Sequence, residues 1–215
     1  MSQQHPDQQT QHPLQTPHSE RHNPEQQTSE QRTPKKTPAE RLSTLSRGTT
    51  AAEALAFFDS LPPVRLDEVI GDWHGADVPT GHRLDGALGP LGWQGKRFEG
   101  AEAARPLIFR TAAGKEFEVN PGLVPLRLAL RIGPLVHKHP GAGRAARPLL
   151  QLTRTGRPRA RLRMMEYRGV VSATMIYDAL PVNDAFRKVD ANTLLGAMDM
   201  RRPAAPFMFS LHRTL

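Results

Sequence analysis

The sequence predicts a mainly β fold, an antiparallel and closed or nearly closed β-barrel behind a short N-terminal helix and a disordered N-terminal tail. Three observations support this prediction. The first 48 residues are nearly without large aliphatic side chains. Beyond them, short alternating or β-branched segments follow one another between turns, at a spacing of roughly 10 to 12 residues. Convincing helix starts are few, so most of the domain is expected to be strands. About eight to ten strands would form the barrel.

Residues 1–48 form the predicted tail of this 215-residue chain. Residues 2–41 are rich in Gln, Pro, His, Ser and Thr, and Leu14 is their only large aliphatic residue. Such a segment cannot bury enough apolar surface to offset the entropy lost on ordering. We therefore expect residues 1–48 to be disordered and residues 49–215 to form a single barrel-like domain.

The folded domain is expected to begin with a short helix. Thr50 and Glu53 have the spacing of a capping box, in which side chains satisfy free backbone N–H groups of the first turn. Apolar residues follow, and a pair of prolines lies beyond the expected helix end. A second helical piece is expected over residues 82–88.

Alternation and turn residues predict the strands. Ala113-Gly114 is expected to join residues 107–111 and 116–119 into a hairpin. The segment 140–147 (PGAGRAAR) is typical of a mobile loop, because glycine and proline interrupt regular structure. Five further strands are expected over residues 159–167, 170–177, 182–189, 194–200 and 207–212.

Several kinds of site are excluded or unsupported. The chain has no cysteine, so disulfides, zinc–thiolate sites, iron–sulfur clusters and cysteine nucleophiles are ruled out. No serine has a nucleophile-elbow context, no glycine-rich phosphate loop is present, and no histidine pair has a standard metal spacing. We therefore expect no catalytic residue, no cofactor and no metal site. No apolar run is long enough to span a membrane, and a cytoplasmic location is expected.

The charge of +8 is unevenly distributed. The stretch between Glu118 and Glu166 holds ten Lys/Arg residues and no acidic residue. It also lacks Phe, Tyr and Trp, which argues against nucleic acid as a partner, because single strands are usually stacked on aromatic rings. A solvated loop and strand face is the simplest interpretation, and attraction to anionic lipid or phosphate is the alternative.

The segment Gly71-Asp72-Trp73-His74-Gly75 is the most pointed motif. Glycine allows close approach of another backbone, and a tryptophan between two glycines fills a large volume. Trp73 is expected to close the base of the barrel as a core residue. The alternative is a ring that lines a ligand pocket.

Six short segments carry a resemblance to the bacterial GXWXG domain family and to the module of unknown function usually paired with it. The segments are GDWHG (71–75), VPTGH (78–82), GWQGKRF (92–98), RLRMMEYRG (161–169), MIYDALP (175–181) and LLGAMD (194–199). The first three resemble the GXWXG part, at about residues 51–125, and the last three the paired module, at about residues 150–213. The family brings no established activity.

The motif also resembles the G-x-W opening of lipocalin-like barrels, which hold apolar ligands or haem. This likeness implies a lipocalin- or calycin-like barrel in which a late arginine packs against the tryptophan. The candidates for that arginine are Arg201, Arg202 and Arg213.

The predicted function is non-enzymatic, intracellular binding of an apolar or amphipathic small molecule, lipid- or fatty-acid-like, inside the barrel. The apolar wall is expected from Trp73, Met164, Met175, Tyr177 and Phe186. Arg168, Asp184 and His82 would fix a polar head group, and the charge of Arg168 would favour an acidic one. Asp184 is expected to point inward, where a carboxylate near Arg163, Arg168 or Arg187 would be either a polar anchor for a ligand or part of a buried ion pair.

Two other functions stay open. An enzyme acting on a lipid-like or small aromatic substrate would be indicated by an inward histidine–carboxylate pair within hydrogen-bond reach. An interaction module, with a barrel filled by its own side chains, would be indicated by an interior without a cavity.

Overall fold

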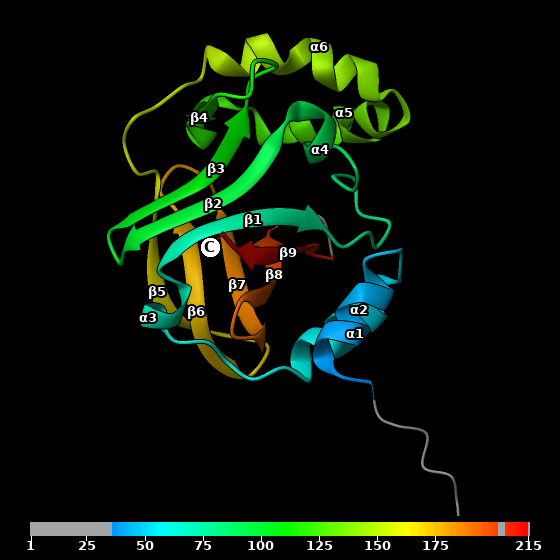
Figure 1. The fold of residues 1–215 in the computed structure, drawn as a ribbon, viewed down its shortest axis with the longest axis vertical. Coiled ribbons are helices and arrows are strands. Elements are labelled where there is room, and N and C mark those ends of the chain that lie inside the picture. The colour runs from blue at the N-terminus through cyan, green and yellow to red at the C-terminus, as the bar shows by residue number, and fades with distance from the viewer. Residues whose placement is uncertain (1–35, 202–204, 215) are drawn as a thin grey trace, which may run out of the picture. The chain divides into compact units, whose positions relative to one another are not determined.

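The computed structural model describes residues 36–201 and 205–214 (Figure 1). The disorder expected for residues 1–35 lies outside the described residues. The end of the predicted tail, however, contains a helix, α1 (Pro38–Leu45), which begins at a capping box between Thr37 and Glu40. Its Leu42 is buried. The folded part therefore begins near Pro38 instead of residue 49, because the capping box starts α1 and Leu42 packs into the apolar cluster outside the barrel wall.

Nine antiparallel strands form one sheet that closes on itself, which confirms the expected mainly β barrel (Figure 1). The strands are β1 (Gly71–Asp77), β2 (Trp93–Gly100), β3 (Ala103–Arg110), β4 (Glu116–Glu118), β5 (Ala160–Tyr167), β6 (Val170–Tyr177), β7 (Val182–Asp190), β8 (Thr193–Met200) and β9 (Phe207–Arg213). Their order is β2-β1-β9-β8-β7-β6-β5-β3-β4, and a further pairing of β2 with β3 closes the ring of eight strands. β4 continues the predicted hairpin beside β3.

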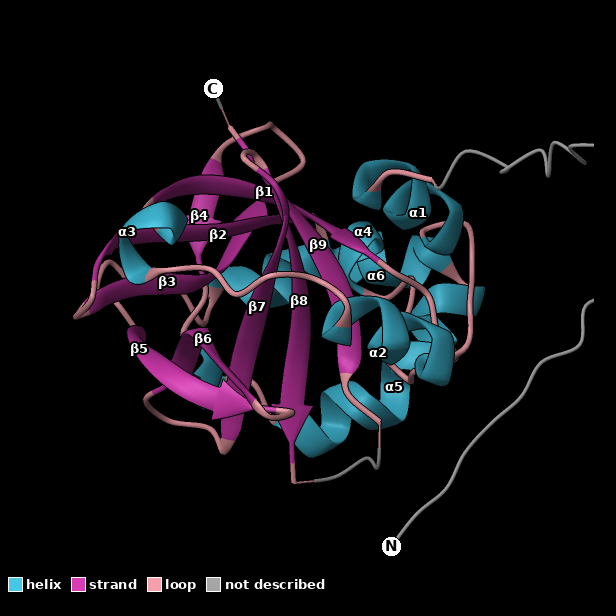
Figure 2. Ribbon diagram, turned by 90° about the horizontal axis from the view of Figure 1, so that it is seen from below, coloured by secondary structure: helices cyan, strands magenta, loops and turns pink. Residues whose placement is uncertain are grey.

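Two helices cover the outside of the barrel wall. The predicted leading helix is confirmed as α2 (Ala51–Asp59), with the capping box of Thr50 and Glu53 in place. Side chains of α1 and α2 pack against β7, β8 and β9 (Figure 2). The short α3 (Leu66–Val69) then leads into β1. This outer cluster is separate from the larger core inside the barrel.

A helical cap covers one end of the barrel. It consists of α4 (Leu88–Leu91), the 3-10 turn η1 (Pro121–Leu123), α5 (Leu126–Lys138) and α6 (Pro140–Gln151). Figure 1 shows α4, α5 and α6 together above the ends of β2 and β3. The helix expected over residues 82–88 is mostly turn, and only its end belongs to α4.

The prediction of a mobile loop over residues 140–147 is wrong, because these residues belong to α6. Pro140 lies in the first turn of the helix, where a missing N–H breaks no helical hydrogen bond. A Cβ atom on Gly143 would lie 2.7 Å from the Cβ of Pro90 and 2.9 Å from Cγ1 of Val136. The glycine therefore permits tight helix packing. None of the helices in the described ranges is long and apolar enough to cross a membrane.

Candidate functional site

Trp73 closes the end of the barrel opposite the helical cap. Its side chain is 2% exposed, and its Nε1 donates to the carbonyl oxygen of Val69 at 2.7 Å. The guanidinium of Arg213 lies 4.2 Å from the centre of the indole ring and donates to the carbonyl oxygens of Ile70 and Glu68. Arg213 is thus the late arginine that packs on the tryptophan. The expected role of Trp73 in the core fits these contacts.

Gly75 of the motif and Gly95 of β2 make room for the second tryptophan of this region. A Cβ atom on Gly75 would lie 2.2 Å from the Trp93 ring, and one on Gly95 would lie 1.9 Å from the carbonyl oxygen of Trp73. Glycine at both positions therefore lets β1 and β2 approach and leaves room for the Trp93 indole. Its Nε1 donates to the carbonyl oxygen of Gly95 at 3.1 Å. The motif in this way places Trp93 in the wall of a pocket.

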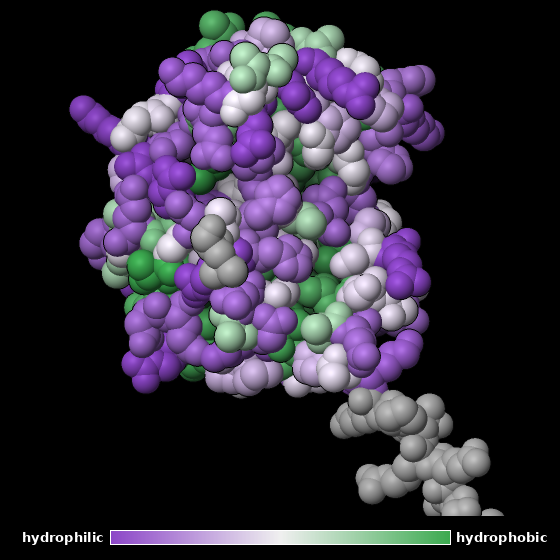
Figure 3. Space-filling model, in the orientation of Figure 1, coloured by the Kyte–Doolittle hydropathy of each residue, from purple (hydrophilic) through white to green (hydrophobic). Residues whose placement is uncertain are grey.

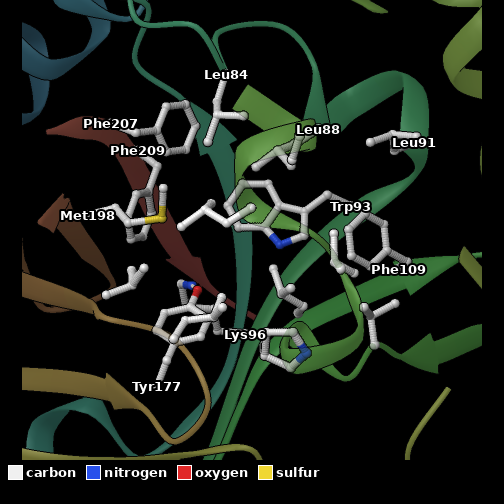
Figure 4. Close-up of a pocket in the computed structure, with 18 of the residues that line it drawn as sticks. Leu84, Leu88, Leu91, Trp93, Lys96, Phe109, Tyr177, Met198, Phe207 and Phe209 are labelled. Atoms are coloured by element: carbon white, nitrogen blue, oxygen red, sulfur yellow. Dashed lines mark hydrogen bonds between the residues drawn. The ribbon is translucent and has the colours of Figure 1, made fainter. Parts of the chain in front are cut away.

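That pocket lies at the capped end of the barrel, with a volume of about 130 Å³ (Figure 4). Helices α4, α5 and α6 contribute leucines and an alanine, and the strands contribute mainly aromatic rings. Lys96 and Tyr177 provide an ammonium and a hydroxyl group on an otherwise nearly apolar surface. Lining residues shown in Figure 4 include Leu84, Leu88, Leu91, Trp93, Phe109, Met198, Phe207 and Phe209.

Lys96 and Tyr177 meet Asp184 in a buried polar cluster. The Nζ of Lys96 lies 2.7 Å from Oδ2 of Asp184, and these side chains are 3% and 0% exposed. Nζ also donates to the carbonyl oxygen of Pro106 at 3.2 Å and to the Tyr177 hydroxyl at 3.4 Å. The Tyr177 hydroxyl donates to Asp184 Oδ2 at 3.3 Å. All three ammonium protons of Lys96 therefore have an acceptor.

The charges of this cluster balance. Burial raises the pKa of Asp184, and the ammonium of Lys96 acts against this rise. Burial and the Asp184 carboxylate together raise the pKa of Tyr177, so the phenol stays neutral. Within the described part of the chain, Oδ1 of Asp184 is buried without a hydrogen-bond partner. The cluster therefore offers free acceptor capacity, and its cation is already compensated.

The structure brings some predicted site residues together and not others. Tyr177 lines the pocket. Asp184 points inward as expected, although its partner is Lys96 instead of an arginine. Trp73, Met175 and Phe186 lie in the same buried core without lining the pocket.

His82 lies beside the pocket, behind one of its walls. Its ring is 5.5 Å from that of Phe207, and its Nδ1 accepts from the backbone N–H of Leu84 at 3.2 Å. Burial lowers the pKa of His82, which favours the neutral ring. Its buried Nε2 has no partner among the described residues. The side chain does not line the pocket.

Met164 and Arg168 lie away from the pocket, which corrects their predicted positions. Met164 is 43% exposed. Arg168 sits at the β5–β6 turn with a φ of 54° and forms two 2.7 Å hydrogen bonds with the carboxylate of Asp59. Arg168 precedes β6 and Tyr177 ends it, so the length of a strand separates them.

A second, partly buried carboxyl lies where β1 meets the cap. Oδ2 of Asp77 accepts from the backbone N–H of Gly86 at 2.8 Å. Burial raises the pKa of Asp77 to about 6, and the neighbouring Asp85 adds to the rise, while His137 acts against it. Asp85 holds the loop that follows β1, because its Oδ2 accepts hydrogen bonds from the backbone N–H groups of three successive residues, 80–82.

Comparisons with known proteins agree with the two parts expected from the sequence. The family model described as "GXWXG protein" matches residues 56–114, and "Domain of unknown function (DUF4334)" matches residues 158–213. The chain is similar to a protein from Thermomonospora curvata of known crystal structure. The two are 28% identical with a TM-score of 0.60, over 83% of this chain and 99% of that one. No curated protein matches this chain.

Proposed function

We propose that this chain, which belongs to the GXWXG proteins that carry the paired module of unknown function, binds a small, uncharged amphipathic molecule in its barrel. The observation that supports this proposal is an apolar pocket of about 130 Å³ with a single polar corner. Apolar cavities of about this size bind molecules as small as benzene. Ligand pockets typically combine such apolar walls with a few polar groups that set orientation.

The polar corner favours a neutral ligand with a hydrogen-bond donor. Lys96 has its three acceptors, and Asp184 neutralises its charge. An anionic head group would have to displace one of these acceptors and lie near the Asp184 carboxylate. A ligand hydroxyl can instead donate to the Tyr177 oxygen without breaking the ion pair.

The acidic head group expected from the sequence depended on Arg168. That side chain is bonded to Asp59 near the opposite end of β6 from Tyr177. We therefore propose an alcohol or phenol in preference to a carboxylic acid. A fluorescence competition between octanol and octanoate compares the two ligand classes directly.

The test is saturable binding of the uncharged fluorophore N-phenylnaphthylamine, followed by displacement with octanol, octanoate and methyl octanoate. Octanol is expected to compete about 3- to 10-fold better than the other two, the value of one net hydrogen bond. Tyr177→Phe should reduce this preference and keep probe binding, because it removes the hydroxyl and retains the ring. Stronger competition by octanoate would overturn the proposed ligand class.

A pocket-filling variant tests the place of binding. Ala129 lines the pocket from α5, so Ala129→Phe should abolish probe binding. The matched control is Ala145→Phe, an exposed position on α6 that lines no part of this pocket. Equal binding by both variants, or no saturable binding by the unaltered chain, would refute the binding function.

The described residues do not show the features expected for the two other functions. Among the described residues no histidine forms an ion pair with a carboxylate, the sign expected for the enzyme. The pocket is likewise unlike the filled interior expected for an interaction module. The pocket therefore supports the binding function most directly.

A further inference from the structure

We propose that the outer surface of α5 and α6 docks on an anionic lipid surface. This proposal does not depend on which molecule occupies the barrel. It rests on exposed aliphatic side chains and unpaired cations that share one face of the cap.

Exposed aliphatic residues gather on the cap. Of the nine large hydrophobic residues that are exposed in the described ranges, six lie between residues 121 and 154, and the other three are scattered. Leu135 is 55% exposed and Leu149 is 67% exposed. Figure 3 shows hydrophobic side chains at the surface at the top of the molecule, where Figure 1 places α5 and α6. The six are Leu123, Leu128, Ile132, Leu135, Leu149 and Leu152.

The sequence of α5 separates an exposed apolar stripe from a cationic one. Leu128, Ile132 and Leu135 follow one another at intervals of four and three residues, so they share one face of the helix. Arg127, Arg131 and Lys138 follow one another at intervals of four and seven residues, so they form a second stripe beside the first. A helix with an apolar face bordered by Lys and Arg is the kind that lies in a membrane interface.

The charge around this face is of one sign. The chain has no acidic residue between Glu118 and Glu166. Arg127, Arg131 and Lys138 are exposed and form no ion pair with any described residue. Elsewhere on the barrel most surface arginines do pair, as Arg168 does with Asp59. The free cations of the cap are therefore available to an anionic surface.

An anionic bilayer fits these features better than other partners. A second copy of the chain would bring two positive faces together. Nucleic acid would meet a face on which the region between Val119 and Met165 offers no Phe, Tyr or Trp for stacking. Anionic lipid satisfies both components, because head groups attract the cations while acyl chains accept the leucines.

A groove links this face to the barrel interior. It has a volume of about 290 Å³, and its outer rim includes Leu128, Ile132 and Leu149. Its lining shares several residues with the pocket described above, among them Leu88, Ala129 and Leu150. If the proposed binding function holds, an apolar ligand can pass between the bilayer and the barrel through this groove without crossing bulk water.

The test is co-sedimentation of the full chain with vesicles of phosphatidylcholine, with and without phosphatidylglycerol. Binding is expected only to the vesicles with anionic lipid, and it should weaken as salt is added, because salt screens exposed charges. Arg127→Glu/Arg131→Glu should weaken binding by at least about 25-fold, since each cation near such a surface contributes about five-fold. Leu128→Ser/Leu135→Ser should weaken it by at least about ten-fold.

Matched controls lie on other parts of the surface. Arg47→Glu reverses an exposed charge beyond α1, and Val171→Ser removes an exposed aliphatic side chain on β6. Both should bind like the unaltered chain. All these positions are exposed, so thermal melting should show that the variants are folded. If the double variant Leu128→Ser/Leu135→Ser unfolds, the double variant Arg127→Glu/Arg131→Glu still tests the proposal.

Three outcomes would overturn the proposal: no sedimentation with anionic vesicles, equal binding to neutral vesicles, or equal losses in the controls. A concentration-dependent dimer abolished by the serine pair, without vesicle binding, would assign the face to a second copy instead. Vesicle binding by Ala129→Phe, which should have lost the probe, would separate docking from the function of the pocket.

Discussion

The two ends of the barrel each contain a buried tryptophan, and the pair differ in what surrounds them. Both rings donate Nε1 to a backbone carbonyl oxygen, Trp73 to Val69 and Trp93 to Gly95. Trp73 is enclosed by the chain and stacked under Arg213, whereas Trp93 borders the pocket. A tryptophan that is packed on all sides contributes to stability, and one beside an empty volume is available to a ligand. One end therefore has a packed core, and the other has the pocket in which we propose that the ligand binds.

The largest expected effect is at the closed end. Trp73→Ala should lower the free energy of unfolding by about 4 kcal/mol, because a large buried ring is lost and its neighbours can relax only in part. Urea denaturation measures this loss. Trp93→Ala should cost less stability and should alter binding of N-phenylnaphthylamine, because it enlarges an existing pocket. A stable Trp73→Ala variant that no longer binds the probe would contradict the division between the two ends.

The strands were predictable because their side chains alternate with a period of two. All five strands expected beyond residue 159 are present, with bounds that differ by one residue or so. The inward direction of Asp184 followed from the same alternation with Val182 and Phe186. Its partner did not, because β2 and β7 meet only when the barrel closes. Lys96 could still have been suspected, since it shares a strand face with Phe98 in the matched segment.

The helices of the cap were not predicted, for a different reason. Its helices contain glycine and proline, which usually interrupt helices. In α5, Gly133 approaches the chain so closely that a Cβ atom would lie 2.2 Å from the carbonyl oxygen of Arg83. Tertiary contact thus requires residues that local propensity disfavours. A ligand pocket inside the barrel was expected, but most of its lining was not, because about a third of the lining residues come from these helices.

A smaller effect is expected where the cap joins β1, and it depends on pH. Since the pKa of Asp77 is raised to about 6 in the folded chain, the folded state holds this proton more tightly than the unfolded state does. The stabilising contribution is full at pH values below the unfolded pKa, which is roughly 4, and is lost as the pH rises to about 6. The loss should amount to about 3 kcal/mol, since each pKa unit corresponds to about 1.4 kcal/mol.

Asp77→Asn removes this titration and keeps an oxygen to accept from the N–H of Gly86. Urea denaturation at several pH values should show a flatter profile between about pH 4 and pH 6 for the variant than for the unaltered chain. Asp178→Asn, at an exposed position, is the control and should keep the original profile. A profile that Asp77→Asn leaves unchanged would show that another group titrates at this end.

The smallest effect is expected from Arg168, the predicted anchor that lies outside the pocket. Its ion pair with Asp59 is exposed, and such pairs contribute about 0.5 kcal/mol, even when two hydrogen bonds are formed. Arg168→Asn is the suitable change, because asparagine tolerates the positive φ of this turn and the variant then loses only the ion pair. Its unfolding midpoint in urea should shift slightly and in proportion to this value. Its order of preference among octanol, octanoate and methyl octanoate should be that of the unaltered chain, whereas Tyr177→Phe should change it. A selective loss of octanoate binding in Arg168→Asn, at unchanged stability, would instead place an anionic ligand near the β5–β6 turn and reverse the comparison between the two ends.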